Sequence, residues 1–153
     1  MIETNARAVA DFLLVFSRDH GDPASNLKLQ KLLYYSQAWF LALHDKPLFS
    51  ETIEAWVHGP AVPPVYGAFK KWTWQPILKE VSAPKDLSAK ARKHLTEVMD
   101  VYGSLTAYQL EKLTHSEDPW KIARKGFPPD AASHEIITHD SMKRYYRAVA
   151  KGK

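Results

Sequence analysis

The residues of this chain with the clearest capacity for chemistry are its seven histidines. Their spacing predicts no metal site, because the sequence has no His-Glu-x-x-His run, no histidine pair at helical i, i+4 spacing and no cysteine. It also lacks a Gly-x-Ser-x-Gly nucleophile motif and a glycine-rich phosphate loop. Folding could still bring His58 and His115 together near Glu117 or Asp118 as an acid–base pair. A small enzyme using His58 and His115 is therefore an alternative, but the sequence favours a protein with no catalytic residue, metal or cofactor.

Composition places the chain among ordinary globular proteins. It has 153 residues, of which 45% are hydrophobic and 25% are charged. This size suits one domain that buries its own core, so we expect a single domain over residues 1–153. The first residues lack the cationic start and cleavage site of a signal peptide. Lys28 and Lys31 also interrupt the longest apolar run before it reaches the ~20 residues needed to span a bilayer. We therefore expect a soluble, cytoplasmic protein.

The net charge of +4 comes from the second half of the chain. Residues 1–76 hold seven Lys or Arg and seven Asp or Glu, whereas residues 77–153 hold fourteen and ten. A basic C-terminal helix could bind nucleic acid through Lys143, Arg144 and Arg147, with Tyr145 or Tyr146 stacking on bases. This is a second alternative function. Because the excess is small, the sequence favours instead a solvated helix end whose cations lie near its negative dipole.

The stretch NLKLQKLLYYSQAWFLAL, residues 26–43, predicts the central helix of the fold. Its apolar residues occur on nearly all sides of a helix, which is typical of a helix buried within a domain. Its leucines, Leu33 among them, are expected to lie in the core. Lys28 and Lys31 are near the N-terminal end of this helix, and we expect them at the surface as solvated charges.

Local signals divide the rest of the chain into further helices and a small β element. Apolar periodicity and end signals predict helices over residues 4–18, 88–102, 106–115 and 118–126, and a short helix beginning near residues 63 and 64. A final helix is predicted to start at Thr138 or Asp140 and to run to about residue 150. Ser88 is a predicted N-cap, and Thr106 and Gln109 have the spacing of a capping box. Alternation predicts a strand over residues 53–58 that a Gly-Pro pair ends, with residues 75–81 as its partner strand and a small strand at 135–137. The expected fold class is mainly α: a single compact helical domain with a buried central helix and two or three short strands.

Three aromatic residues leave alternatives open. Trp56 is either covered by a helix or part of a recognition patch, where Trp and Tyr are enriched, and the covered position is favoured. Tyr34 and Tyr35 are adjacent on the central helix, so at least one ring must point away from its main face. The hydroxyl of that ring then needs a buried partner or the solvent.

Two longer stretches resemble a known family. The sequence LKLQKLLYYSQAWFLAL, followed by KPLFSETIEAWVHGPAVPPVYGAFK, is similar to the Panacea domain, also called the SocA-like antitoxin domain and known from phage-associated GepA-type proteins. The later LEKLTHSEDPWKIAR resembles the second signature of that family, with its histidine, its Pro-Trp pair and its basic end. The resemblance covers about residues 27–124, which is most of the chain.

The resemblance implies an antitoxin that binds and neutralises a cognate small toxin encoded beside it. One branch of the family acts as an adaptor that delivers its toxin to an ATP-dependent protease. The implied partners are therefore a protein toxin and, for such an adaptor, that protease. We expect no membrane partner, and nucleic acid stays the less favoured alternative. Binding requires a shaped surface rather than a nucleophile or a metal. The family signature falls on Lys28, Leu29, Gln30, Lys31, Tyr34, Tyr35, Trp56, His58, Gly59, Pro60, Val62, Tyr66, His115, Pro119 and Trp120. Within it, the residues expected to contact the partner are Lys28, Lys31, Tyr35, Trp56, His58, Tyr66, His115 and Trp120.

Overall fold

A computed structural model of the protein describes residues 2–152. Its helices are α1 (Ala6–Asp19), α2 (Asn26–His44), α3 (Pro63–Ala68), α4 (Ala89–Tyr102), α5 (Ala107–Ser116), α6 (Asp118–Ala123) and α7 (His139–Lys151), with a 3-10 turn at Lys70–Trp72. Its strands are β1 (Ile53–Trp56), β2 (Gly59–Ala61) and β3 (Ile136–Ile137). The fold is thus mainly α with a small β element, as the sequence predicts. No helix in the described range has both the length and the apolar character needed to cross a membrane.

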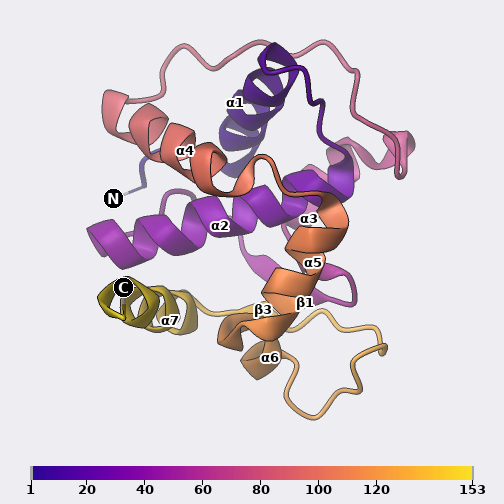
Figure 1. Ribbon diagram of the computed structural model, residues 1–153, viewed down its shortest axis with the longest axis vertical. Helices are drawn as coiled ribbons and strands as arrows, with labels where there is room; N and C mark the ends of the chain where they lie inside the picture. The colour runs from indigo at the N-terminus through magenta and orange to yellow at the C-terminus, as the bar shows by residue number, and fades with distance from the viewer. Residues whose placement is uncertain (1, 153) are drawn as a thin grey trace.

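Helix α2 runs through the middle of the molecule. In Figure 1 it lies with α1 and α4 on one side and with α7 and the small sheet on the other. Ser25 caps its first turn by accepting a hydrogen bond from the Lys28 backbone N–H. Leu29, Leu32 and Leu33 are fully buried, and each such leucine stabilises the fold by about 1.5–3 kcal/mol. The prediction of a buried central helix is therefore confirmed.

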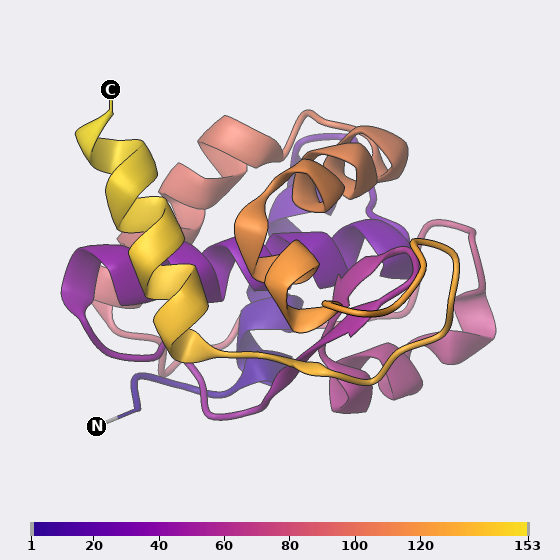
Figure 2. The same cartoon turned by 90° about the horizontal axis from the view of Figure 1, so that it is seen from below.

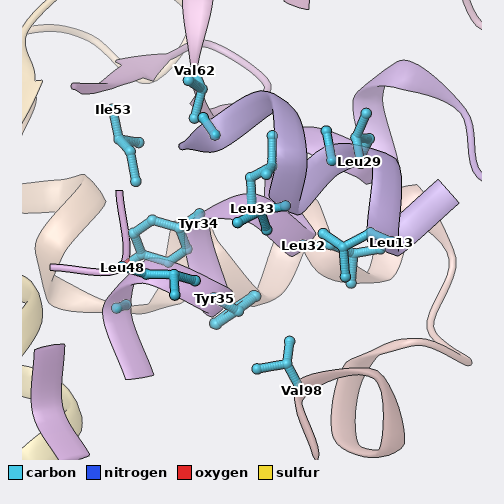
Figure 3. Packing of buried hydrophobic residues seen from close by; sticks show 14 of the residues in the cluster. Leu13, Leu29, Leu32, Leu33, Tyr34, Tyr35, Leu48, Ile53, Val62 and Val98 are labelled. Carbon is cyan, nitrogen blue, oxygen red and sulfur yellow. The ribbon is translucent and has the colours of Figure 1, made fainter. Parts of the chain in front are cut away.

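The core surrounds α2 rather than lying against one face of it. Figure 3 shows Leu33 and Tyr34 on the side of Val62 and Ile53, whereas Tyr35 lies on the side of Val98. Figure 2 shows that α7 crosses α2, although the two helices are far apart in the sequence. A helix enclosed in this way needs apolar side chains around its whole circumference, which explains its composition.

Both tyrosines of α2 find hydrogen-bond partners, one of them buried and the other half-buried. The hydroxyl groups of Tyr34 and Tyr146 are hydrogen-bonded at 2.9 Å. Tyr35 donates to Glu117 Oε1 at 2.6 Å, and Tyr146 donates to the same oxygen at 2.8 Å. Burial raises the pKa of the Glu117 carboxyl, although both of these hydrogen bonds act against that rise. Tyr35 therefore ties α2 to the junction of α5 and α6 through the core.

The sheet differs from its prediction in one strand. Its order is β2-β1-β3, and both pairings are antiparallel, with Trp56 opposite Gly59 and Ile53 opposite Ile137. The predicted strand at residues 75–81 is wrong, because Pro76 forms only an isolated bridge to Ser25 and the residues after it form no strand. The partner of β1 is instead β2, which contains the Gly-Pro pair expected to end the first strand. Proline is tolerated there because β2 is an edge strand, which leaves part of its backbone without a ladder partner.

Most helix ends form as their local signals predict. Ser88 caps α4, Thr106 and Gln109 form the full capping box of α5, and Thr138 caps α7. Pro119 lies in the first turn of α6, where the missing N–H costs no helical hydrogen bond. The small strand predicted at 135–137 is confirmed as β3.

The expected surface position of Lys28 and Lys31 is wrong. Only 6% of Lys28 and 1% of Lys31 is exposed. The Lys28 ammonium donates to the Gly103 carbonyl at 2.6 Å and pairs with Asp22 at 3.3 Å. These lysines are buried because the α4–α5 connection and the β1–β2 hairpin close over the first turns of α2, a consequence of tertiary packing rather than of the helix itself.

Candidate functional site

The β1–β2 hairpin is held against α2 by a buried chain of hydrogen bonds. The Val62 backbone N–H donates to Gln30 Oε1 at 2.8 Å, and the Gln30 amide donates to Asn26 Oδ1 at 2.9 Å. The Asn26 amide then donates to the Tyr66 carbonyl at 3.0 Å. Two polar side chains at i, i+4 spacing on α2 thereby fix both the hairpin and the start of α3.

Glycine is required where the hairpin comes closest to the helices. Gly59 has a φ of +112°, a backbone conformation that residues with a Cβ atom rarely adopt. A Cβ atom at this position would lie 3.1 Å from both Lys31 Cε and Thr114 Oγ1. The hairpin backbone therefore packs directly on α2 and α5 at Gly59.

A pocket of about 270 Å³ lies beside this hairpin. Its walls come from α2, from the hairpin, from α3 and from the loop before β3. The lining residues are Leu27, Gln30, Lys31, Trp56, Val57, His58, Gly59, Pro60, Ala61, Tyr66, Ala132, Ser133 and His134. The rings of Trp56 and Tyr66 meet edge to face, with their centroids 5.0 Å apart. The pocket is thus a concave and largely apolar surface with a few polar groups, which is the usual form of a binding site.

Lys31 is the unusual group in this pocket. Within residues 2–152 no hydrogen bond or ion pair holds its Nζ atom, although the residue is almost completely buried. Burial lowers the pKa of Lys31 from 10.5 to about 7, and the charge of Glu111 only partly opposes this change. The pocket therefore contains a lysine that readily gains or loses its proton near neutral pH.

The two histidines that line the pocket each lie beside an acidic residue. His58 Nδ1 lies 3.2 Å from Glu111 Oε2, and His134 Nδ1 lies 3.1 Å from Glu54 Oε1. Glu54 Oε1 also accepts a hydrogen bond from Trp56 Nε1 at 2.8 Å. Both imidazoles are exposed, so they mark the mouth of the pocket, whereas Lys31 lies inside it.

The pocket gathers half of the residues predicted to contact a partner. Those that line it are Lys31, Trp56, His58 and Tyr66. Trp56 is half-buried and lies outside the core, so the favoured covered position is not confirmed. The other predicted residues, Lys28, Tyr35, His115 and Trp120, do not line it. Tyr35 is fully buried in the core and Lys28 binds Gly103, so neither presents its polar group to a partner.

His115 and Trp120 support the hairpin from behind. Their rings stack at a centroid distance of 3.9 Å, and Trp120 Nε1 donates to the Trp56 carbonyl at 2.8 Å. Arg124 lies over the Trp120 ring and donates to the Ala55 carbonyl. Burial lowers the pKa of His115. These contacts position β1 and so support the wall of the pocket.

Among residues 2–152, no hydrogen bond or ion pair joins His58 or His115 to Glu117 or Asp118, the groups of the enzyme alternative. His58 faces Glu111, while the Glu117 carboxylate is occupied by Tyr35 and Tyr146 on the side of the core. In the part of the chain that the structure describes, no three His, Asp or Glu side chains could hold a metal ion together.

The alternative of nucleic-acid binding is also poorly supported by the geometry of α7. Tyr146 is 1% exposed, so it cannot stack on a base. Lys143 and Arg147 both pair with Asp45, at 3.0 and 3.6 Å, and Arg144 pairs with Asp140 at 2.9 Å. The cations of α7 are therefore partly neutralised by neighbouring carboxylates.

Among the polar groups described in and around the pocket, Gln30, Glu54, Glu111 and His134 carry no contact prediction from the sequence. The i, i+4 spacing of Asn26 and Gln30 within an apolar helix is a signal that could have revealed their hydrogen bond. Glu54 and Glu111 lie on separate elements, and no local pattern indicates that they pair with His134 and His58.

Comparison with known proteins identifies the family. The family described as "Antitoxin SocA-like, Panacea domain" matches residues 29–121. A curated relative, the protein named Antitoxin SocA from Caulobacter vibrioides, is 34% identical over 136 residues, which cover 80% of this chain and 71% of the relative. The chain belongs to the SocA-like Panacea antitoxin family. No solved structure matches it at a significant level.

The Panacea match covers the region that builds most of the pocket. Residues 29–121 run from the first turn of α2 through most of α6, and they include Lys31, Trp56, His58 and Tyr66. Leu27 and the wall formed by residues 132–134 lie outside the matched range. One wall of the pocket is thus contributed by a segment beyond the shared Panacea region.

Proposed function

We propose that this chain is an antitoxin that binds a small protein toxin encoded beside it and neutralises that toxin by forming a direct complex. The observation that carries the proposal is membership of the SocA-like Panacea family, supported by a relative named as an antitoxin. We also propose that residues 1–153 act as one Panacea domain, since α2 packs against helices from both ends of the chain.

The proposed contact surface is the mouth of the pocket. It consists of His58, Trp56 and Tyr66 from the predicted set, together with His134 from the loop before β3. Aromatic side chains beside a concave site are typical of the residues that dominate protein–protein binding energy. The loop wall lies outside the family match, which suits a protein whose partner differs from that of its relatives.

The decisive experiment is co-expression with the product of each adjacent gene. We expect one neighbour to stop growth when expressed alone and this protein to restore growth. The two proteins should then co-purify as a complex. If no neighbour is toxic, or if toxicity persists in the presence of this protein, the proposal is wrong.

Neutralisation could proceed in a second way, in which this protein delivers the toxin to an ATP-dependent protease. The two mechanisms predict different toxin lifetimes. Simple blocking leaves the toxin stable in the complex, whereas delivery shortens its half-life only when both this protein and the protease are present. A pulse-chase measurement in cells with and without the protease therefore distinguishes them.

A further inference from the structure

Lys31 is a buried lysine of α2 that lines the pocket and has no paired carboxylate in the described part of the chain. A buried ammonium normally has a partner, because transfer of an unpaired charge out of water is costly. Lys28, on the same helix, follows this rule through Gly103 and Asp22. Lys31 is more deeply buried, yet its Nζ atom has no hydrogen-bond acceptor among residues 2–152. A destabilising group of this kind is expected where function requires it.

The surroundings of Lys31 limit which ligand groups could reach its ammonium and accept a hydrogen bond from it. Its Nζ lies next to Gly59, since a Cβ atom on that glycine would be 3.3 Å from it, and both residues line the pocket. Trp56 and Tyr66 form an aromatic wall, and His58 and His134 lie at the opening. An incoming group that reaches Lys31 must therefore be narrow, must pass apolar walls, and must end in a hydrogen-bond acceptor.

The charge of the pocket lining favours a carboxylate as the group that binds Lys31. Lys31 is the only lysine or arginine among the described residues that line the pocket, and Glu111 lies nearby. One ammonium matches the single negative charge of a carboxylate, whereas a phosphate carries more charge than this site could neutralise. The aliphatic stem of Asp or Glu also suits the apolar walls.

We propose that the pocket receives an Asp or Glu side chain of the toxin and that Lys31 forms a buried ion pair with that carboxylate. This inference rests on the proposed antitoxin function and names the chemistry of its contact. Outside the complex Lys31 is partly neutral near pH 7, and the incoming carboxylate favours its charged form. Complex formation above about pH 7 therefore takes up a proton at Lys31.

Proton uptake at Lys31 must be distinguished from proton uptake or release by other titratable groups near it. They are Glu111 and His115 of α5, His58 of the hairpin, His134 of the loop before β3 and Tyr66 of α3. A working range of about pH 7.5 to about pH 9 lies above that in which ordinary carboxyls and imidazoles titrate and below that of an ordinary tyrosine. A proton taken up in this range that disappears when Lys31 is replaced belongs to Lys31.

The first test measures toxin binding by calorimetry, with the toxin identified by co-expression. In two buffers of different ionisation enthalpy, the wild-type complex should take up close to one proton toward pH 9. Its affinity should fall as the pH rises, by up to about tenfold per pH unit. Lys31→Met should bind roughly 30-fold or more weakly, because it leaves the toxin carboxylate buried without a partner. It should also show no proton uptake. Lys143→Met, which removes a partly exposed lysine of α7 that does not line the pocket, should behave as wild type.

The second test uses propionate, which has the carboxylate and stem of a glutamate side chain and requires no toxin. Titration of the Lys31 Nζ by NMR should show that propionate raises the pKa of Lys31 and that propionamide does not. If propionate has this effect but toxin binding takes up no proton, the occupant is a free carboxylate, and a toxin side chain is ruled out. If neither ligand affects Lys31, the pocket is not a carboxylate site. In both cases normal rescue of growth would still support the antitoxin function. The experiments therefore test the antitoxin function and the carboxylate contact at Lys31 independently.

Discussion

Replacing Lys31 with methionine should stabilise this protein, although the substitution removes a residue proposed to be needed for binding. Methionine has a similar length and fills the same space without a charge. Burial lowers the pKa of Lys31 from 10.5 to about 7. Below pH 7 the protein therefore folds with a buried ammonium, although burial favours the neutral amine. Burying this charge lowers the free energy of unfolding by roughly 4–5 kcal/mol.

The sign of the pH dependence follows from the same two pKa values. The contribution of Lys31 to stability is most favourable above about pH 10.5, where both states are neutral, and it is lost as the pH falls toward about 7. Over that range the unfolded chain holds a proton that the folded chain has released. The advantage of Lys31→Met over the wild type is thus largest below pH 7 and should shrink by roughly 1.4 kcal/mol for each pH unit above it.

Urea unfolding of both proteins at pH 6 and at pH 9 measures this advantage directly. We expect Lys31→Met to be more stable at pH 6 and its lead to decrease by roughly 2–3 kcal/mol at pH 9. Lys28→Met is the matched control, since it removes a buried lysine of the same helix that has partners. It should lose stability at both pH values, by roughly 1–3 kcal/mol, because the Gly103 carbonyl loses its donor. A Lys31→Met protein that is less stable than the wild type at pH 6, or whose lead does not change with pH, would refute the reasoning.

Three further substitutions test the fold around the site. Leu33→Ala should lower the free energy of unfolding by about 2–5 kcal/mol through lost burial and a cavity, and unchanged urea stability would contradict the central position of α2. Gly59→Ala should lower the melting temperature, because the positive φ at this position strains a residue with a Cβ atom by roughly 1–3 kcal/mol and the added Cβ would contact Lys31. An unchanged melting temperature would count against this close approach. Tyr35→Phe should cost roughly 1 kcal/mol by removing one of the two tyrosine hydrogen bonds to Glu117, and calorimetric unfolding that matches the wild type would show that this hydrogen bond contributes nothing.

The sequence by itself was sufficient to predict the helices and to identify the family. The cap at Ser88 and the capping box at Thr106 involve residues only three positions apart, so their hydrogen bonds form wherever the helix forms. The apolar circumference of α2 likewise predicts a buried helix without knowledge of its neighbours. The Panacea resemblance depends on the order of residues alone, and the family match confirms it.

Only the tertiary structure decided the partner of β1 and the surroundings of the two lysines. A Gly-Pro pair indicates a turn locally, and β2 forms across it because Gly59 can adopt a positive φ and Pro60 lies on an edge strand. Lys28 and Lys31 have the same residue type and lie one helical turn apart, so no local pattern separates them. Lys28 meets a carbonyl 75 residues away, whereas Lys31 meets a hairpin and a loop that enclose it without supplying an acceptor. Burial and pairing depend on contacts between segments distant in the chain, and periodicity within one helix does not contain that information.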